Sequence, residues 1–266
     1  MARTDAGRRY RIGRADLRDA LTWRAVLGSV TVLLLTVGFY TGIGLLRSQG
    51  GAEPGEYLQS MAFQLRMMVP IVGVVFGYSA IARRRERHTI RLFLSASYSR
   101  EDVYVGTLAS RVVAASLPAG ITASTICGIV LALASPRPMA LVVFCLSTLA
   151  LTGAFTSVAV AASVVGGTAR RALGASLLVF VASIVLWSPV VSLATLLTEG
   201  GGASETISGI VWSLAPTQAY SFLVQAGVPA VDGPGAIVVA ASGLSLFGWS
   251  FLPAVIGHWW FSRTDI

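Results

Sequence analysis

The stretch RRRERHTIRLFLSASYSREDVYVG, residues 83–106, decides how this chain is organised. It is a dense run of charge in a chain in which only 12% of residues are charged, and it separates two long apolar segments. At helical spacing its apolar and polar side chains fall on opposite faces. The apolar face holds Ile90, Phe93 and Leu94, and the polar face holds Arg84, His88, Arg91 and Ser95. The pattern predicts a short amphipathic helix lying on a bilayer surface or on a partner protein.

The composition around this stretch is that of a membrane protein. The 266 residues are 55% hydrophobic, with a mean hydropathy of +0.74, whereas about a quarter of the residues in a soluble domain are charged. Every one of the twenty basic residues is Arg. Without a Lys the chain has no Walker A lysine, so it is not itself a P-loop ATPase. Because the Arg residues flank apolar segments and form no surface stripe, we expect no nucleic-acid partner.

The apolar segments predict an all-α, polytopic membrane protein with six transmembrane helices. Crossing a hydrocarbon core of about 30 Å takes roughly 20 helical residues, and six segments reach that length: 25–46, 61–82, 105–134, 139–165, 172–197 and 236–261. Residues 1–24 are expected to form an interfacial connecting helix whose apolar stripe is Tyr10, Gly13, Leu17 and Leu21. Residues 198–235 are too interrupted to span, with a break at Pro216, and are expected to form an outer re-entrant segment.

The Arg distribution predicts the orientation. With both termini in the cytoplasm, the inner segments hold seven Arg in residues 3–24, seven in 83–111, two at 170–171 and one at 263. The outer side then holds only Arg47, Arg66 and Arg137. Such asymmetry follows the positive-inside rule, so we expect a multi-pass protein of the cell (plasma) membrane with cytoplasmic ends. Arg66, near the start of the second span, is expected to extend to the outer interface.

The 83–106 stretch also resembles the segment that follows the second membrane helix in ABC-2 type transporter permeases. The matching residues are Glu86, Thr89, Ile90, Phe93, Leu94, Ser95, Ser99, Arg100 and Gly106, while His88, Ser97 and Thr107 depart from the usual Gly, Pro and Lys. The run RADLRDALTWR, residues 14–24, resembles the connecting helix that precedes the first span in the same family. Six spans with cytoplasmic ends are the layout of one ABC-2 half-transporter.

This resemblance implies a permease subunit that is not itself an enzyme, and export is the expected direction of transport. Residues 83–104 would be the coupling helix that docks on a separate ATPase subunit, present in two copies, which binds ATP and Mg. A second permease, identical or related, would complete the transporter in the lipid bilayer. The expected coupling residues are Glu86, Arg87, Thr89, Ile90, Phe93, Leu94, Arg100 and Glu101. Within the family, the ends and the coupling stretch look most like permeases of copper-enzyme maturation (NosY-like) systems.

Several local features carry expectations of their own. Ser99, followed by Glu101 and Asp102, is predicted to cap a helix N-terminus. Gly38 with Gly42, and Gly73 with Gly77, are small-xxx-small pairs that permit close helix contact. The fourth span is rich in small residues and is expected to be buried. Cys127 and Cys145 are expected at similar depth, either as two small packing side chains or as a disulfide.

Other kinds of site have weaker support in the sequence. No cofactor or metal site is expected in this chain, because neither His88 nor His258 has further ligands at short spacing. Another class of function is an intramembrane serine protease of the rhomboid type, with Ser176 in Gly174-Ala175-Ser176 as the nucleophile and His258 as the base. Activity that depended on Ser176 would distinguish it from a transporter.

Overall fold

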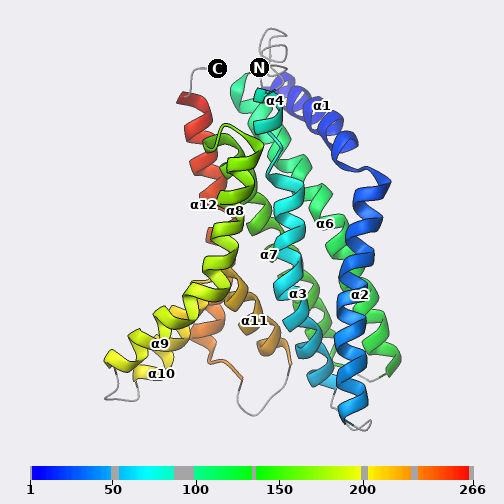
Figure 1. Ribbon diagram of the computed structural model, residues 1–266, viewed down its shortest axis with the longest axis vertical. Coiled ribbons are helices and arrows are strands. Elements are labelled where there is room, and N and C mark those ends of the chain that lie inside the picture. Colours follow the sequence, from blue (N-terminus) through cyan, green and yellow to red (C-terminus); the bar gives the residue numbers. More distant parts are fainter. Residues whose placement is uncertain are drawn as a thin grey trace.

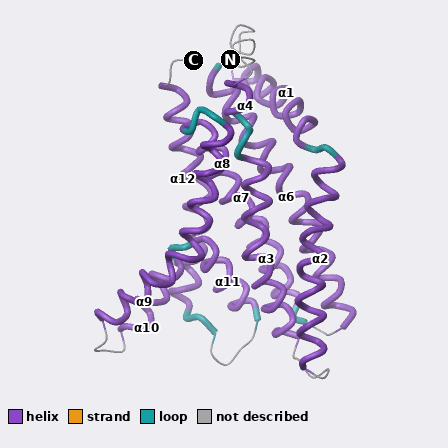
Figure 2. Tube along the Cα trace, in the orientation of Figure 1, coloured by secondary structure: helices purple, strands orange, loops and turns teal. Residues whose placement is uncertain are grey.

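The computed structural model describes residues 2–48, 54–86, 99–133, 136–198, 203–228 and 233–263. Within these ranges every regular element is a helix (Figure 2). Six stretches of the described chain are long and apolar enough to cross a membrane: Trp23–Ile43, Tyr57–Glu86, Arg100–Ala132, Pro138–Val165, Ala169–Leu193 and Ala236–Arg263. The predicted all-α fold with six spans is confirmed.

Figure 1 shows the helices side by side, with both chain ends at one end of the bundle. The first half of the chain forms α1 (Ala2–Ala20), α2 (Trp23–Ser48), α3 (Pro54–Gly77), α4 (Ala82–Glu86) and α6 (Arg100–Leu133). The second half forms α7 (Pro138–Val165), α8 (Ala169–Val181), a π-helical turn η1 (Ala182–Leu186), α9 (Trp187–Thr198), α10 (Ala203–Ser213), α11 (Pro216–Gly227) and α12 (Ala236–Arg263). Helices α8, η1 and α9 are continuous, and α9 bends away from the bundle (Figure 1).

Helix α7 is the centre of the bundle and packs against α3, α6, α8, α11 and α12. Its small residues permit this, as the sequence predicted. A Cβ added at Gly73 would lie 3.0 Å from the Cβ of Phe155, and one at Gly77 would lie 2.6 Å from the Cβ of Ala159. The predicted close contact at this glycine pair is therefore confirmed.

The other glycine pair behaves differently. No described atom lies within 4 Å of a Cβ built at Gly38 or Gly42. The close helix contact expected at these two positions is therefore not formed within the described part of this chain. The two glycine pairs have the same spacing but different surroundings. Gly73 and Gly77 of α3 lie against the central helix α7, whereas no described helix lies as close to Gly38 and Gly42 of α2.

Between the last two spans, α10 and α11 form a helical hairpin whose second arm enters the bundle. Helix α11 begins at Pro216, which occupies a position where its missing N–H costs nothing. Tyr220 is fully buried, and α11 packs against α3, α7 and α12. Arg66 of α3 donates through Nη1 to the side chains of Gln218 and Ser221, at 2.9 and 3.2 Å. The extension of Arg66 to the outer interface stays a prediction, and the structure adds that α11 supplies its two polar partners.

Candidate functional site

The end of the bundle that carries both termini also holds the two described edges of the 83–104 stretch (Figure 1). The incoming edge is α4, and the outgoing edge is the first turn of α6. Glu86, Arg100 and Glu101 belong to these edges. The other expected coupling residues, Arg87, Thr89, Ile90, Phe93 and Leu94, lie outside the described residues.

The outgoing edge begins with a capped helix. The backbone N–H of Asp102 donates to Ser99 Oγ at 3.0 Å, and Glu101 and Asp102 occupy the first turn of α6. The predicted cap at Ser99 is confirmed, and the two acids lie where the helix dipole favours negative charge. Because α6 starts at Arg100, residues 100–104 continue directly into a membrane span. A displacement of this edge would therefore be carried into α6.

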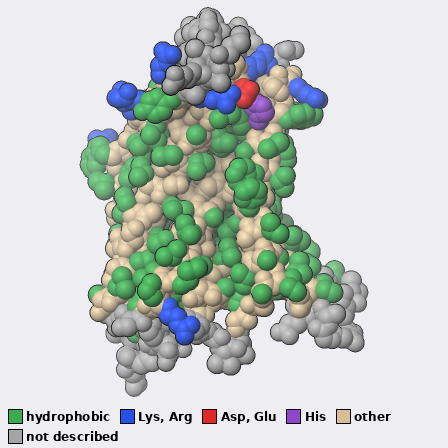
Figure 3. Space-filling model, turned by 180° about the vertical axis from the view of Figure 1, so that it is seen from behind, with side chains coloured by type: hydrophobic (Ala, Val, Ile, Leu, Met, Phe, Trp, Pro, Cys, Tyr) green, Lys and Arg blue, Asp and Glu red, His purple; other side chains and the backbone are tan. Residues whose placement is uncertain are grey.

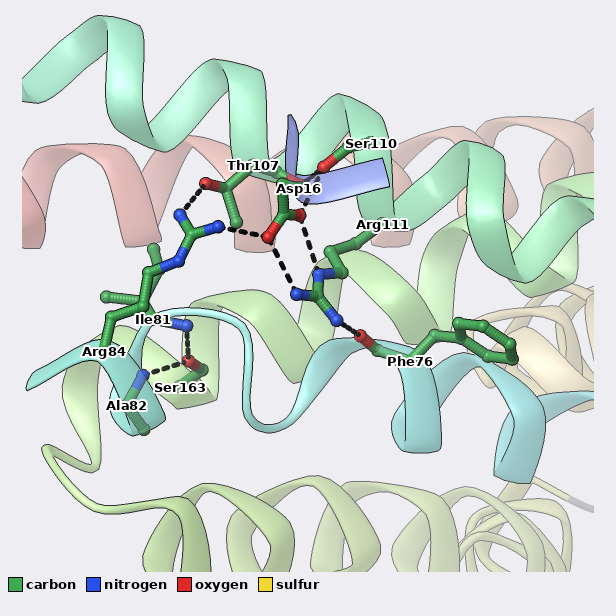
Figure 4. A network of polar contacts seen from close by, with 9 residues as sticks. All are labelled: Asp16, Phe76, Ile81, Ala82, Arg84, Thr107, Ser110, Arg111 and Ser163. Carbon is green, nitrogen blue, oxygen red and sulfur yellow. Dashed lines mark hydrogen bonds and ion pairs between the residues drawn. The ribbon is translucent and has the colours of Figure 1, made fainter. Parts of the chain in front are cut away.

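The most elaborate contact at this end is built around Asp16 of α1 (Figure 4). Its side chain has no exposed surface. It accepts hydrogen bonds from Arg84 Nη2, from Arg111 Nε and Nη2 at 2.8 Å each, and from Ser110 Oγ at 2.5 Å. The side chains of Arg84 and Arg111 are only 16% and 14% exposed. One buried carboxylate thus pairs with two largely buried guanidinium groups, one from α4 and one from α6.

The same two arginines extend the network to further elements. Arg84 Nη1 donates to Thr107 Oγ1 of α6 at 3.0 Å, and Arg111 Nη1 donates to the carbonyl of Phe76 in α3 at 3.3 Å. Charge-assisted, partly bidentate bonds of this kind fix orientation as well as distance. Four elements, α1, α3, α4 and α6, are therefore joined through Asp16, Arg84 and Arg111. We call these three residues the Asp16 cluster.

Helix α1 reaches this position because it crosses α6 closely. A Cβ added at Gly13 would lie 3.2 Å from the carbonyl oxygen of Gly106, and one at Gly106 would lie 3.0 Å from the carbonyl oxygen of Arg9. Of the predicted apolar stripe, Leu17 and Leu21 pack against the buried core, whereas Tyr10 is 68% exposed. The buried row contains Ile12, Asp16 and Ala20 instead.

Sequence reasoning missed Asp16 as a functional residue. The signal available was its place at i, i+4 and i+8 with Ile12 and Ala20, which puts one acid in an otherwise apolar row. When a helix is assessed only by its most apolar stripe, an acid in another row of the same helix is overlooked. The partners, at positions 84 and 111, carry no local indication that they belong with it.

The incoming edge is fixed to the central helix. Ser163 Oγ of α7 accepts the backbone N–H groups of Ile81 and Ala82, at 2.8 and 2.9 Å (Figure 4). Arg85 Nη1 donates to the carbonyl of Val164 at 3.1 Å. Because Ala82 is the first residue of α4, a side chain from α7 satisfies donors at the start of that short helix. The turn between α3 and α4 is thereby held against α7.

Glu86 and Arg100, two of the expected coupling residues, contact other helices of this chain. Glu86 Oε1 accepts the backbone N–H of Ala169, the first residue of α8, at 2.9 Å. Its negative charge lies at a helix N-terminus, where it is favourable. Arg100 Nη1 approaches the carbonyl of Ser262, near the end of α12, at 3.4 Å. These residues therefore link the stretch to α8 and α12.

Glu101, the third described coupling residue, pairs with α1. Arg9 donates through Nη2 to Glu101 Oε1 at 2.7 Å and through Nε to Asp102 Oδ1 at 2.9 Å. The hydrogen bond to Asp102, with the nearby charge of Glu101, raises the pKa of Arg9. The pairing adds a second connection between α1 and α6, more exposed than the Asp16 cluster.

The residues of the alternative protease site are not assembled into one. Ser176 Oγ is buried and donates to the carbonyl of Ala172 within its own helix at 2.7 Å. The His258 ring lies 5.7 Å from the ring of Tyr104, centroid to centroid. No hydrogen bond joins the two side chains, both of which are described. In the described part of the chain, no group of three or more His, Cys, Asp or Glu could hold a metal ion.

Comparison with known proteins agrees with this arrangement of helices. The family model described as ABC-2 family transporter protein matches residues 10–266, which is nearly the whole chain. The comparison with curated proteins gives no match. The match begins within α1 and includes the Asp16 cluster, all six candidate spans and the 83–104 stretch. The chain is a multi-pass membrane protein and belongs to the ABC-2 family of transporter proteins, as a permease subunit of an ABC transporter.

Proposed function

We propose that this permease subunit is driven by a separate ABC ATPase that docks on residues 83–104. The observation that carries the proposal is that both edges of this stretch are bonded to several helices. Arg84 pairs with Asp16 of α1, Glu86 caps α8, and Arg100 contacts the end of α12. A push on the stretch would act on these helices together.

The likeness to the family supports the remaining parts of the assembly. The transporter would comprise two permease chains, identical or related, and two copies of the ATPase, which binds ATP and Mg. Export is the proposed direction, and a NosY-like permease of a copper-enzyme maturation system is the narrower alternative. We place the docking end in the cytoplasm, because blue Arg side chains gather at the end that carries both termini, while hydrophobic side chains cover much of the flanks (Figure 3).

Co-purification in mild detergent tests the docking. The chain is expressed with the genes that neighbour its own, and the proteins that elute with it are identified and quantified. We expect a P-loop ATPase at about one copy per permease chain. Phe93→Asp, which places a charge on the predicted apolar docking face, should abolish this co-elution. Arg137→Ala is the control, since Arg137 is exposed at the opposite end of α7 from Ser163. A permease that elutes alone would overturn the proposal.

A pair of substitutions separates docking from helix capping at Glu86. Gln keeps an oxygen that can accept the Ala169 N–H but has no charge, whereas Ala removes both. If the Glu86 charge contacts the ATPase, Glu86→Gln and Glu86→Ala should both lose the partner. If Glu86 acts by holding α8, only Glu86→Ala should lose ATP-dependent transport, with the ATPase still bound.

A further inference from the structure

A polar pocket lies between α3 and α11, away from the Asp16 cluster. Its volume is about 390 Å³, which is within the range of small-ligand sites. Six of the residues around it are polar: Gln59, Ser60, Arg66, Gln218, Ser221 and Gln225. None of the described lining residues is acidic. The pocket thus presents one positive charge among uncharged hydrogen-bonding groups.

Arg66 carries a charge within a candidate membrane span, where a charged side chain is energetically unfavourable. It is the tenth residue of the Tyr57–Glu86 candidate span, about 14 Å along the helix from Tyr57 at 1.5 Å per residue. A guanidinium within a membrane-spanning segment costs several kcal/mol unless it is compensated, so such residues are commonly functional. Within the described chain the compensation comes from two neutral groups, Gln218 and Ser221, and the face of the Phe63 ring, whose centroid lies 4.7 Å from Cζ.

The guanidinium group also has unused donor capacity. Both of its hydrogen bonds within the described chain are made by Nη1. The Nε atom is buried and has no hydrogen-bond partner among the described residues. An arginine has five N–H donors in a planar fork that matches a carboxylate or phosphate bidentately. The edge formed by Nε and Nη2 can therefore donate two hydrogen bonds to the oxygens of an oxyanion.

We propose that this pocket binds the oxyanion group of a ligand, a phosphate or a carboxylate, with Arg66 as the charged anchor. Gln218 and Ser221 orient the guanidinium, while Gln59 of α3 and Gln225 of α11 offer amide N–H donors. Helix α11 enters the bundle from the segment between the last two spans, so it completes the pocket with residues that no membrane span supplies. The named residues of the site all belong to this chain. The proposal does not depend on the docking of an ATPase on residues 83–104.

Binding to the full-length chain, without any ATPase, tests the site. One arm titrates inorganic phosphate against chain in phosphatidylcholine nanodiscs at constant ionic strength, and measures the thermal unfolding midpoint. The other arm measures retention of phosphatidylglycerol against phosphatidylcholine by native mass spectrometry. An Arg66-dependent signal only with phosphate indicates a soluble ligand, and one only with phosphatidylglycerol indicates a lipid headgroup.

The variants distinguish an anion site from a structural arginine. We expect Arg66→Gln to weaken binding about tenfold or more, since a charge-assisted bidentate pair is lost. Arg66→Lys should weaken it less, because the charge remains. Arg137→Gln removes an exposed arginine elsewhere and should leave binding unchanged. Gln218→Ala removes a partner of Arg66 while keeping its charge, and serves if Arg66→Gln fails to elute as a folded species.

Two results would overturn the proposal. One is that the wild-type chain binds neither inorganic phosphate nor phosphatidylglycerol in preference to phosphatidylcholine. The other is equal weakening by Arg66→Gln and Arg137→Gln, which would show that general positive charge, and not this pocket, attracts the anion. Neither result depends on whether an ATPase co-purifies, so this inference and the docking proposal fail separately.

Discussion

Replacing Asp16 with asparagine should weaken the attachment of α1 to the bundle. Asparagine has nearly the same shape, but it has a single side-chain oxygen and no charge. Of the four hydrogen bonds that Asp16 accepts, about two would be lost, and the NH₂ group would face cationic donors. Bonds to charged groups contribute about 1.5–3 kcal/mol each, and breaking a buried ion pair typically costs about 3–5 kcal/mol. We expect a loss of about 3–5 kcal/mol in the docking free energy of α1.

Proteolysis of the full chain in nanodiscs measures this loss. Trypsin cleaves a helix only when it opens, so the rate of cleavage after Arg11 reports the population of detached α1. At about 1.4 kcal/mol per tenfold change, the expected acceleration is roughly two to three and a half orders of magnitude. Asp19→Asn is the matched control, because Asp19 is exposed on the same helix and carries the same charge.

A second variant tests whether the loss of protection comes from uncompensated buried charge and not merely from a change at residue 16. The triple substitution Asp16→Leu, Arg84→Met, Arg111→Met removes all three charges, and an apolar replacement of a complete buried ion cluster is often close to neutral. It should restore most of the protection that Asp16→Asn removes. If Asp16→Asn is cleaved within about threefold of the wild-type rate, the burial and pairing of this carboxylate do not hold α1, and the reasoning is refuted.

Three other predictions follow from close contacts. Gly77→Ala should destabilise the chain by about 1–3 kcal/mol in detergent unfolding, because the new Cβ would lie 2.6 Å from that of Ala159. The control Gly28→Ala, with open space around it, should be neutral or slightly stabilising. Equal effects of the two substitutions would contradict the packing. Ser163→Ala should cost about 1–3 kcal/mol, because it leaves two backbone N–H groups without their partner, whereas Thr156→Ala, whose hydroxyl bonds only within its own helix, should cost less. Oxidation with copper–phenanthroline should join Cys127 to Cys145, whose Sγ atoms lie 3.5 Å apart, and mass spectrometry should show the loss of two hydrogens; a chain that stays reduced, like the Cys145→Ser control, would contradict the contact.

The sequence was sufficient for features that depend on neighbours along the chain. Hydropathy over about 20 residues identified the six spans, because the cost of burying polar groups in lipid acts on every residue of a segment. Ser99 as a helix cap and Gly73 with Gly77 as a contact surface were also predicted, since each depends on residue types at short spacing. The family likeness at 83–106 was carried by one continuous stretch.

Contacts between distant segments were decided only by the tertiary structure. Arg66 is hydrogen-bonded to Gln218, which lies 152 residues away in the sequence, and Glu86 to Ala169, which lies 83 residues away. From the sequence alone, an arginine near the start of a span is expected to extend to water. An acid in a basic stretch is expected to face a partner protein. Which of these outcomes holds depends on whether another helix brings a donor or acceptor within about 3 Å.

Asp16 shows this division most clearly. The sequence placed an acid on an N-terminal amphipathic helix, and only its row with Ile12 and Ala20 distinguishes it from Asp19, which the structure leaves exposed. The crossing of α1 over α6 at Gly13 and Gly106 buries one of the two. A buried carboxylate must be compensated by hydrogen-bonded cations, so the side chains that satisfy it come from whatever helices are packed around it, and their identity is a property of the packing alone.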